Sequence, residues 1–181
     1  MSAGSRRAAR IVLGLAAGLV VLFGGQWLYR WTTFTRPLQA AMASRAEVES
    51  YRVDSQATPP VIQVRLRPVA NLQESYRSLE QALDASLGSG RFRLEVADRR
   101  DAELTSDYYR LNLVLAEGLA TGHFLDMDRR AQQMARTLGL RRLTLTVDER
   151  YLYVTMVKGS HYLYELVPRA AAGKSEVSGS G

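Results

Sequence analysis

Hydrophobic and polar residues alternate along residues 61–67, VIQVRLR. Successive side chains of a β-strand point to opposite faces, so this period of two predicts a strand with one buried face. The inward positions are Ile62, Val64 and Leu66, and the outward positions are Gln63, Arg65 and Arg67. The sequence FRLEV, residues 92–96, repeats the pattern, with Arg93 and Glu95 outward. The alternation therefore predicts two half-buried strands.

Between and after these strands, leucine and tyrosine recur at helical spacing. One helix is predicted to begin after Asn71, which can form a capping box with Glu74, and to stop at Gly88. A second helix is predicted to begin after the cap residue Asp101 and to end near Gly122. Each helix has one apolar stripe, so each is expected to cover one face of a sheet.

Residues 143–167 are predicted to form three further strands joined by hairpin turns. A two-residue turn at Asp148-Glu149 would pair Leu145 with Leu152, and a turn at Lys158-Gly159 or Gly159-Ser160 would form the second hairpin. These two possible turns differ by two residues in the pairing of the strands, and a shift of two leaves every side chain on the same face of the sheet. The core-facing set is Leu143, Leu145, Val147, Leu152, Val154, Met156, Leu163 and Val167. The opposite set is Thr144, Thr146, Tyr151, Tyr153, Thr155, Val157, Tyr162, Tyr164 and Leu166.

The order of these elements predicts an α+β domain, β-α-β-α-α-β-β-β, with one mainly antiparallel sheet over residues 61–169. Three helices are enough to cover one face of a five-stranded sheet, so the other face is expected to be open. Residues 48–55 are expected to add an edge strand. Glu165 is a misfit on the core-facing side, and it requires either a position at the sheet margin or an arginine partner.

The open face is rich in tyrosine and arginine, which are enriched at protein interfaces. One hypothesis is a surface for a protein partner or for self-association; the alternative is an ordinary solvated sheet face. The candidate partner-binding residues are Arg65, Arg67, Arg93, Tyr151, Tyr153, Tyr162 and Tyr164. Nucleic-acid binding is disfavoured, because residues 45–169 carry 18 basic and 17 acidic residues and are nearly neutral.

Residues 11–29 contain no charged residue, and a helix of this length matches the apolar core of a bilayer. The residues expected at the membrane interface are Arg10, Trp27, Tyr29, Arg30 and Trp31. A cleaved signal peptide is less well supported, because the first small-residue cleavage pattern, Ala41-Met42-Ala43, lies far beyond the apolar run. A buried helix is the other alternative. The pattern favours a retained single-pass anchor in a cell membrane.

The distribution of charge gives an orientation for this anchor. The N-terminal tail, residues 1–10, holds three arginines and no acid, and the first 16 residues after the span also hold three, Arg30, Arg36 and Arg45. The tail concentrates its charge in ten residues with the α-amino group, which favours a cytoplasmic N-terminus and an extracytoplasmic domain. Residues 30–60 are expected to form a linker with a juxtamembrane helix at about residues 38–48. The last residues, 170–181, are small and polar and predict a disordered tail.

Candidate chemistry is sparse. The chain has no cysteine, which excludes a thiolate metal site and a cysteine nucleophile. His123 lies near Asp126 and Asp128, but we expect one of these aspartates to cap a third helix at about residues 127–138, which stops at Gly139. None of the phosphate, dinucleotide, hydrolase or zinc-protease motifs occurs, so neither catalytic residues nor a cofactor is assigned.

Together these features predict a membrane-anchored interaction or assembly module of a bacterial envelope. The partners expected are the lipid bilayer and a protein, the latter bound through the tyrosine and arginine face. The alternative is a small membrane-tethered sensor or hydrolase domain with a site near His123. A deep polar pocket there would favour this alternative.

Overall fold

The computed structural model describes residues 35–43 and 45–169. These residues form an α+β fold with four helices and two three-stranded sheets. The chain divides into two compact units. Of the described residues, one unit comprises 35–43, 45 and 46 together with Gln81–Arg91, and the other comprises Glu47–Glu80 and residues 92–169. Helix α3, Leu72–Leu87, contributes to both units.

The first unit contains α2, Arg36–Ala43, whose buried residues are Leu38, Ala41 and Met42. A helix was predicted at residues 38–48, but the helix ends earlier, because the chain becomes extended at Val48. The proposed membrane anchor, its interfacial residues and the C-terminal tail lie outside the described residues. Among the helices of the described part, none has the length and apolar character needed to cross a bilayer.

The first sheet of the larger unit has the strand order β1-β2-β3. Strand β1, Val48–Asp54, confirms the expected edge strand and pairs antiparallel with β2, Val61–Leu66. Strand β3, Arg93–Ala97, pairs parallel with β2, because α3 returns the chain to the same end of the sheet. The inward residues predicted for β2 are buried, and Ile62, Val64 and Leu66 have no exposed surface.

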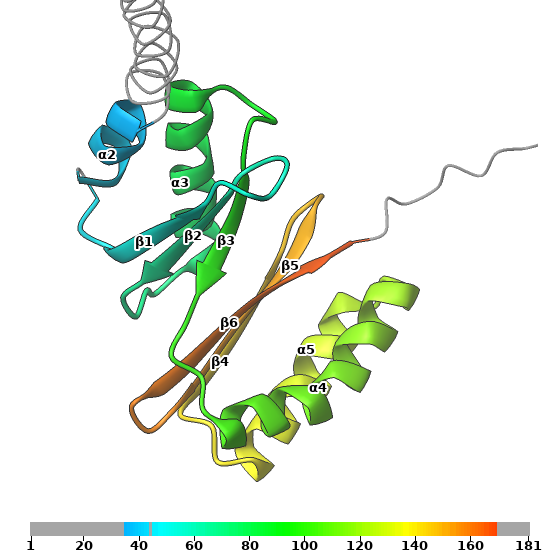
Figure 1. Ribbon diagram of the computed structural model, residues 1–181. Helices are drawn as coiled ribbons and strands as arrows, with labels where there is room; N and C mark the ends of the chain where they lie inside the picture. Colours follow the sequence, from blue (N-terminus) through cyan, green and yellow to red (C-terminus); the bar gives the residue numbers. More distant parts are fainter. Residues whose placement is uncertain (1–34, 44, 170–181) are drawn as a thin grey trace, which may run out of the picture. The chain divides into compact units, whose positions relative to one another are not determined.

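The second sheet contains β4, Arg142–Val147, β5, Tyr151–Lys158, and β6, His161–Pro168. All neighbouring strands are antiparallel. Helices α4, Ala102–Thr121, and α5, Phe124–Thr137, pack on one face of this sheet (Figure 1). Their core contains Leu104, Leu111, Leu115, Met127 and Ala131 from the helices and Leu143, Leu152, Val154, Met156 and Leu163 from the strands. This confirms the predicted core-facing set at five of its positions.

Both ends of α4 follow the predicted capping signals, but the start of α5 does not. Asp101 accepts a hydrogen bond from the backbone N–H of Leu104 at 2.7 Å, and Gly122 ends α4 in a left-handed conformation. Helix α5 instead begins at Phe124, three residues before the predicted start. Neither aspartate caps it, since Asp126 and Asp128 already lie inside its first turns. The predicted aspartate cap is therefore wrong.

The first hairpin turns one residue later than the predicted Asp148-Glu149 turn. Val147 pairs with Leu152, and Leu145 pairs with Val154, a shift of two residues that preserves every face. The Asp148 N–H donates to the Tyr151 carbonyl at 2.9 Å, and the Asp148 carboxylate accepts the backbone N–H groups of Arg150 and Tyr151 at 2.7 and 2.8 Å, so the chain turns at Glu149 and Arg150. In the second hairpin, Lys158 pairs with His161, as predicted for a Gly159-Ser160 turn.

The main correction concerns the tyrosine face, which was predicted to be open. Tyr153, Tyr162 and Tyr164 are buried, and Tyr153 is only 1% exposed. The Tyr162 hydroxyl donates to the carbonyl of Leu66 at 2.8 Å, and the Tyr164 hydroxyl accepts the N–H of Val69 at 2.9 Å. The strands form two sheets instead of one, and the first sheet with α3 supplies a second layer over these rings.

Helices α4 and α5 approach each other closely at Gly118. A Cβ atom at this position would lie 2.5 Å from Cβ, Cγ and Sδ of Met127. We expect Gly118→Ala to lower the free energy of unfolding by about 1–3 kcal/mol, because the Met127 side chain cannot move away at its Cβ. Urea unfolding followed by circular dichroism would measure the loss. The exposed Asn112→Ala on the same helix is the control, and equal stability of both variants would contradict this packing.

Candidate functional site

A groove lies where the edges of β3 and β6 separate. The chain after β3 meets β6 at a single antiparallel bridge between Arg99 and Tyr162. Beyond this bridge the two strands no longer pair, and a hollow of about 310 Å³ opens between Leu94 and Val96 on one side and Leu166 on the other. We call this hollow the edge groove. It brings together two strand edges that belong to different sheets.

The backbone of both edges is directed toward the edge groove. The Arg93 N–H donates to the Pro60 carbonyl at 2.8 Å, so the backbone groups of Arg93 point toward β2. Backbone groups of neighbouring strand residues point to opposite edges, so those of Leu94 and Val96 point away from β2. On β6, Tyr162 exchanges hydrogen bonds with Arg99, which places Tyr162, Tyr164 and Leu166 on the edge away from β5.

The edge-facing backbone groups of β6 have hydrogen-bond partners only along the first part of the strand, among the described residues. The Tyr164 N–H donates to Asp98, and the Tyr164 carbonyl accepts from Arg100. In the described part of the chain, no such partner is found for the edge-facing groups of Leu166. An extended chain can satisfy backbone groups of this kind.

The walls of the edge groove are aromatic and locally neutral in charge. Tyr76 from α3 and Tyr151 from β5 pack edge to face with their ring centroids 6.0 Å apart. Burial raises the pKa of Tyr76 and of Tyr164, so both phenols stay uncharged at neutral pH. The four charged side chains form two ion pairs, Arg93 with Glu95 at 3.6 Å and Arg100 with Glu165 at 3.1 Å.

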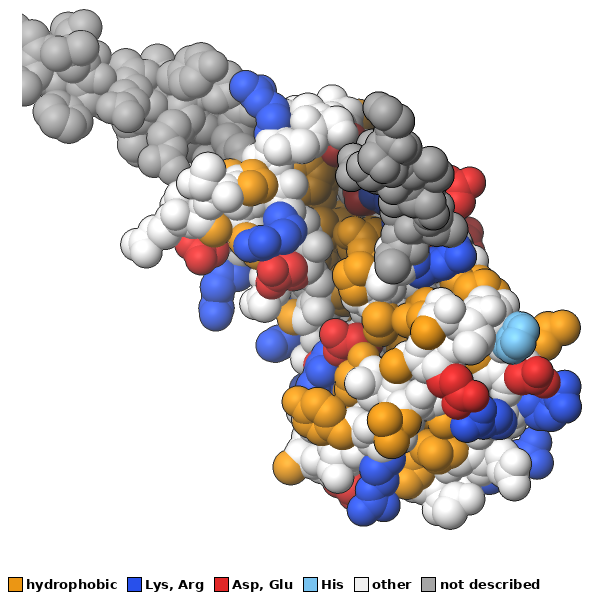
Figure 2. Space-filling view, turned by 90° about the vertical axis from the view of Figure 1, so that its right-hand side faces the viewer, with side chains coloured by type: hydrophobic (Ala, Val, Ile, Leu, Met, Phe, Trp, Pro, Cys, Tyr) orange, Lys and Arg blue, Asp and Glu red, His pale blue; other side chains and the backbone are white. Residues whose placement is uncertain are grey.

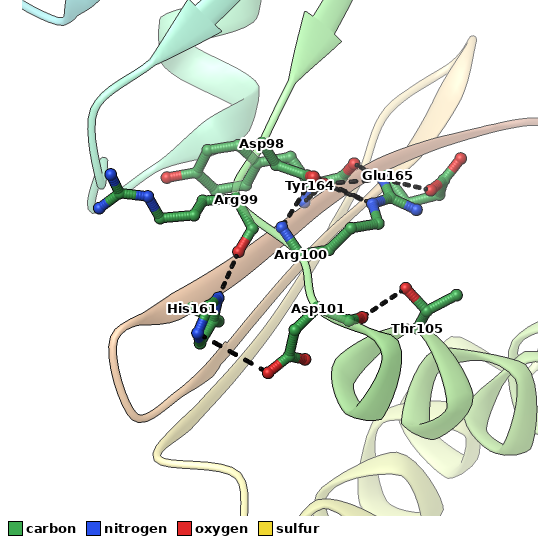
Figure 3. Close-up of polar contacts among 8 residues, drawn as sticks. All are labelled: Asp98, Arg99, Arg100, Asp101, Thr105, His161, Tyr164 and Glu165. Carbon is green, nitrogen blue, oxygen red and sulfur yellow. Dashed lines mark hydrogen bonds and ion pairs between the residues drawn. The ribbon is translucent and has the colours of Figure 1, made fainter.

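Figure 3 shows a polar cluster that includes Arg100, Tyr164 and Glu165, which also line the edge groove. The Asp98 carboxylate, with its side chain 6% exposed, accepts the Tyr164 N–H at 2.8 Å and pairs with Arg100 at 2.7 Å. The Arg100 guanidinium also donates to the Tyr164 carbonyl and to Glu165, both at 3.1 Å. The hydrogen bond with Asp98 outweighs desolvation and raises the pKa of Arg100. These contacts fix the β6 edge where the edge groove begins.

His161 lies at the outer end of the same cluster (Figure 3). Its Nδ1 is 3.1 Å from the carbonyl of Arg99, and its Nε2 is 3.8 Å from the Asp101 carboxylate. The other Asp101 oxygen caps α4, and the Asp101 carbonyl accepts the Thr105 hydroxyl. The cluster therefore joins the chain between β3 and α4 to β6, and its contacts account for a structural role.

The structure separates the predicted partner-binding residues. Arg93, Tyr151 and Tyr164 line the edge groove, but the bulk of the Tyr164 ring is buried. Two others, Tyr153 and Tyr162, are buried in the layer between the sheets. The remaining two, Arg65 and Arg67, are exposed and do not line the groove.

Sequence reasoning did not identify Tyr76, Asp98 and Arg100 as site residues. Glu165 was the available signal, because a carboxylate on an apolar face requires a partner, and that partner is Arg100. No such signal marks Tyr76, whose position fits an ordinary helical stripe.

A second hollow, of about 250 Å³, lies between α4 and α5 beside His123. Its carboxylates are paired with arginines: Glu117 lies 2.7 Å from Arg130, and Asp126 lies 3.0 Å from Arg129. These pairs engage the acids that could orient His123 as a general base. Within residues 35–43 and 45–169, no group of three or more histidine and acidic side chains is placed to hold a metal ion.

Searches of protein-family models, curated proteins and solved structures give no match to this chain. The geometry of the chain is therefore the evidence on its function.

Proposed function

We propose that this protein is a membrane-anchored, non-enzymatic interaction module that binds an extended polypeptide segment in the edge groove. The observation that carries the proposal is the pair of open strand edges, Leu94 and Val96 on β3 and Leu166 on β6, on either side of one hollow. A segment added to such an edge gains main-chain hydrogen bonds, and its alternate side chains enter the hollow.

The walls indicate the character of the ligand. Tyr76 and Tyr151 offer ring surface, and aromatic side chains contribute strongly at the centre of interfaces. The arginines of the groove are already paired with Glu95 and Glu165, so an acidic ligand would have to compete for them. The proposed ligand is therefore an uncharged, extended segment with apolar side chains at alternate positions.

The proposal can be tested with two variants of Leu166, one that removes the backbone N–H and one that removes only the side chain. Random peptides displayed on phage would be selected on the full chain in lipid nanodiscs, and selected peptides would be measured by fluorescence anisotropy. We expect Leu166→Pro to weaken binding at least tenfold, because proline removes the N–H that faces the groove but leaves the β5 ladder intact. Leu166→Ala keeps the N–H and is expected to bind within about threefold of the parent.

Amide hydrogen exchange supplies an independent readout that needs no variant. A peptide bound along the β6 edge should slow exchange at Leu166 in the unmodified chain, since a new hydrogen bond protects that amide. Equal binding to the proline and alanine variants, or unchanged exchange at Leu166 with peptide bound, would overturn the proposal of strand addition.

The proposed location is the extracytoplasmic side of a bacterial cell membrane, with residues 11–29 as the anchor. Alkaline phosphatase fused after Arg169 is expected to be active, because that enzyme requires an oxidising compartment. A cytoplasmic reporter fused at the same residue is expected to be inactive. The reverse pair of results would place the domain on the cytoplasmic side.

A further inference from the structure

Helix α4 has a second apolar stripe on the side opposite its core. Tyr109 is 69% exposed and Leu113 is 78% exposed, and the exposed Ala116 and Ala120 continue the same line. We call these four residues the outer stripe. Their spacings of four, three and four residues are those of the contact positions of a coiled coil. In Figure 2, hydrophobic side chains reach the surface in the part of the molecule that α4 and α5 form.

The outer stripe is additional to the face that stabilises the fold. Leu104, Leu111, Leu115 and Gly118 are buried on the other side of α4. A surface helix normally has one apolar stripe and a polar outer face. Two large apolar side chains left in water at coiled-coil spacing indicate a helix that is covered by another element.

We propose that the outer stripe packs antiparallel against the outer stripe of a second copy of this chain. The sizes of the side chains favour this arrangement. A two-fold axis between Leu113 and Ala116 places Tyr109 opposite Ala120 of the second copy, and Leu113 opposite its Ala116. Each large side chain then meets a small one, as close packing requires. A parallel pair would instead stack tyrosine on tyrosine and alanine on alanine.

The charges beside the outer stripe favour the same arrangement. Arg110 and Glu117 flank it on one side, seven residues apart in sequence, and antiparallel packing brings Arg110 of each copy next to Glu117 of the other. Within one chain, Arg110 forms no ion pair with another described residue. Glu117 contacts Arg130 but remains half exposed, so its carboxylate can accept a second arginine. A parallel pair would place Arg110 beside Thr105 or Asn112, which are uncharged.

One helix pair forms a small interface, which is expected to be weak in free solution. The anchor proposed above would confine both copies to one membrane and raise their effective concentration. The inference uses that part of the proposed function and is independent of peptide binding in the edge groove. Disulfide formation in membranes is therefore the suitable assay.

The absence of native cysteine allows single cysteines to report the packing without background. Leu113→Cys and Ala116→Cys lie beside the proposed axis and are each expected to form disulfide-linked dimers in membranes. Tyr109→Cys and Ala120→Cys, expressed separately, are expected to give none. Co-expressed with different tags, these two should crosslink to each other. The exposed Gln133→Cys on α5 is the background control.

Charge exchange at the flanking residues tests the antiparallel pairing separately, with one cysteine at position 113 as the reporter of association. In the Leu113→Cys background, Arg110→Glu alone and Glu117→Lys alone should each reduce crosslinking several-fold, because both create like-charge contacts. A mixture of the two variants with different tags should restore crosslinking between them, since each repulsive pair becomes attractive. All substituted positions are exposed, so the fold is expected to survive.

The outcomes separate the possibilities. Strong self-crosslinking of Tyr109→Cys would indicate a parallel pair and overturn the antiparallel arrangement. Crosslinking of the stripe variants no higher than that of Gln133→Cys would show that α4 does not self-associate. Peptide binding to the edge groove, measured on the same variants, should remain at parental affinity. Loss of crosslinking with intact peptide binding would therefore remove this inference alone, and loss of peptide binding alone would leave it standing.

Discussion

Replacing Tyr153 with alanine is expected to lower the free energy of unfolding by about 3–5 kcal/mol. Its ring is only 1% exposed and lies 6.0 Å, centroid to centroid, from the ring of Tyr76 on α3. Its hydroxyl donates to the Asp148 carboxylate at 2.8 Å. Alanine would leave a cavity between the two sheets and would also remove a partner from a buried charge.

Urea unfolding of the full chain in detergent, followed by circular dichroism, would measure this loss. Tyr153→Phe keeps the ring and removes only the hydroxyl, so a smaller loss of about 1–2 kcal/mol is expected. Tyr109→Ala is the exposed control and should change stability by less than about 1 kcal/mol. Equal, small losses at Tyr153 and Tyr109 would mean that the tyrosine face is open to solvent after all.

The contrast between these tyrosines explains where sequence reasoning succeeded and where it failed. Period-two alternation correctly separated the two faces of the strands, and Leu152 and Val154 are buried under the helices as predicted. Alternation does not identify what lies over the second face. Tyrosine suits either a solvated sheet or a second layer, because its ring is apolar and its hydroxyl can reach a backbone carbonyl such as that of Leu66.

The edge groove depends on pairings that the sequence does not encode locally. It exists because β3 pairs parallel with β2, while in the described chain the segment after β3 forms a backbone bridge with β6 at Arg99 and no further ladder. Propensity and period place each strand, but they do not decide which edges remain unpaired. Glu165 indicated a polar contact at this place, although its partner Arg100 is far away in sequence.

The outer stripe of α4 was not predicted from the sequence, for a different reason. Helical periodicity marks Leu104, Leu111 and Leu115, which form the core side of α4. Tyr109 and Leu113 fall outside that stripe and carry no meaning until the core side is known. Exposure in the folded chain distinguishes a second apolar stripe from a wide first one.

Asp148 connects the first hairpin to the layer over the tyrosines, and Asp148→Ala is expected to cost about 2–4 kcal/mol of unfolding free energy. The carboxylate is 6% exposed. It accepts the N–H groups of Arg150 and Tyr151 and the Tyr153 hydroxyl, and it lies 3.2 Å from the Arg77 guanidinium. Removing it leaves the buried Tyr153 hydroxyl and the N–H groups of the turn without this acceptor and opens the turn after Asp148 that sets the β4–β5 register.

The dependence of this loss on pH provides a sharper test than its size. Burial alone would raise the pKa of Asp148, but the hydrogen bonds from Tyr151, Tyr153 and Arg150, with the charge of Arg77, together hold it below the ordinary value of 3.8. The native state therefore binds fewer protons here than the unfolded chain, and the stabilisation is fully present above about pH 5. It should disappear as the pH falls through the lowered native pKa.

The unfolding free energies of the parent and of Asp148→Ala would be measured from neutral to acidic pH. The difference between the two is expected to shrink toward low pH. Asp84→Ala, which removes an aspartate on α3 that shows no such set of contacts, is the control for the loss of a carboxylate at neutral pH. If the loss from Asp148→Ala stayed constant into acid, the carboxylate would act through its shape and not through its charge. The hydrogen bonds that define the turn would then contribute through geometry alone.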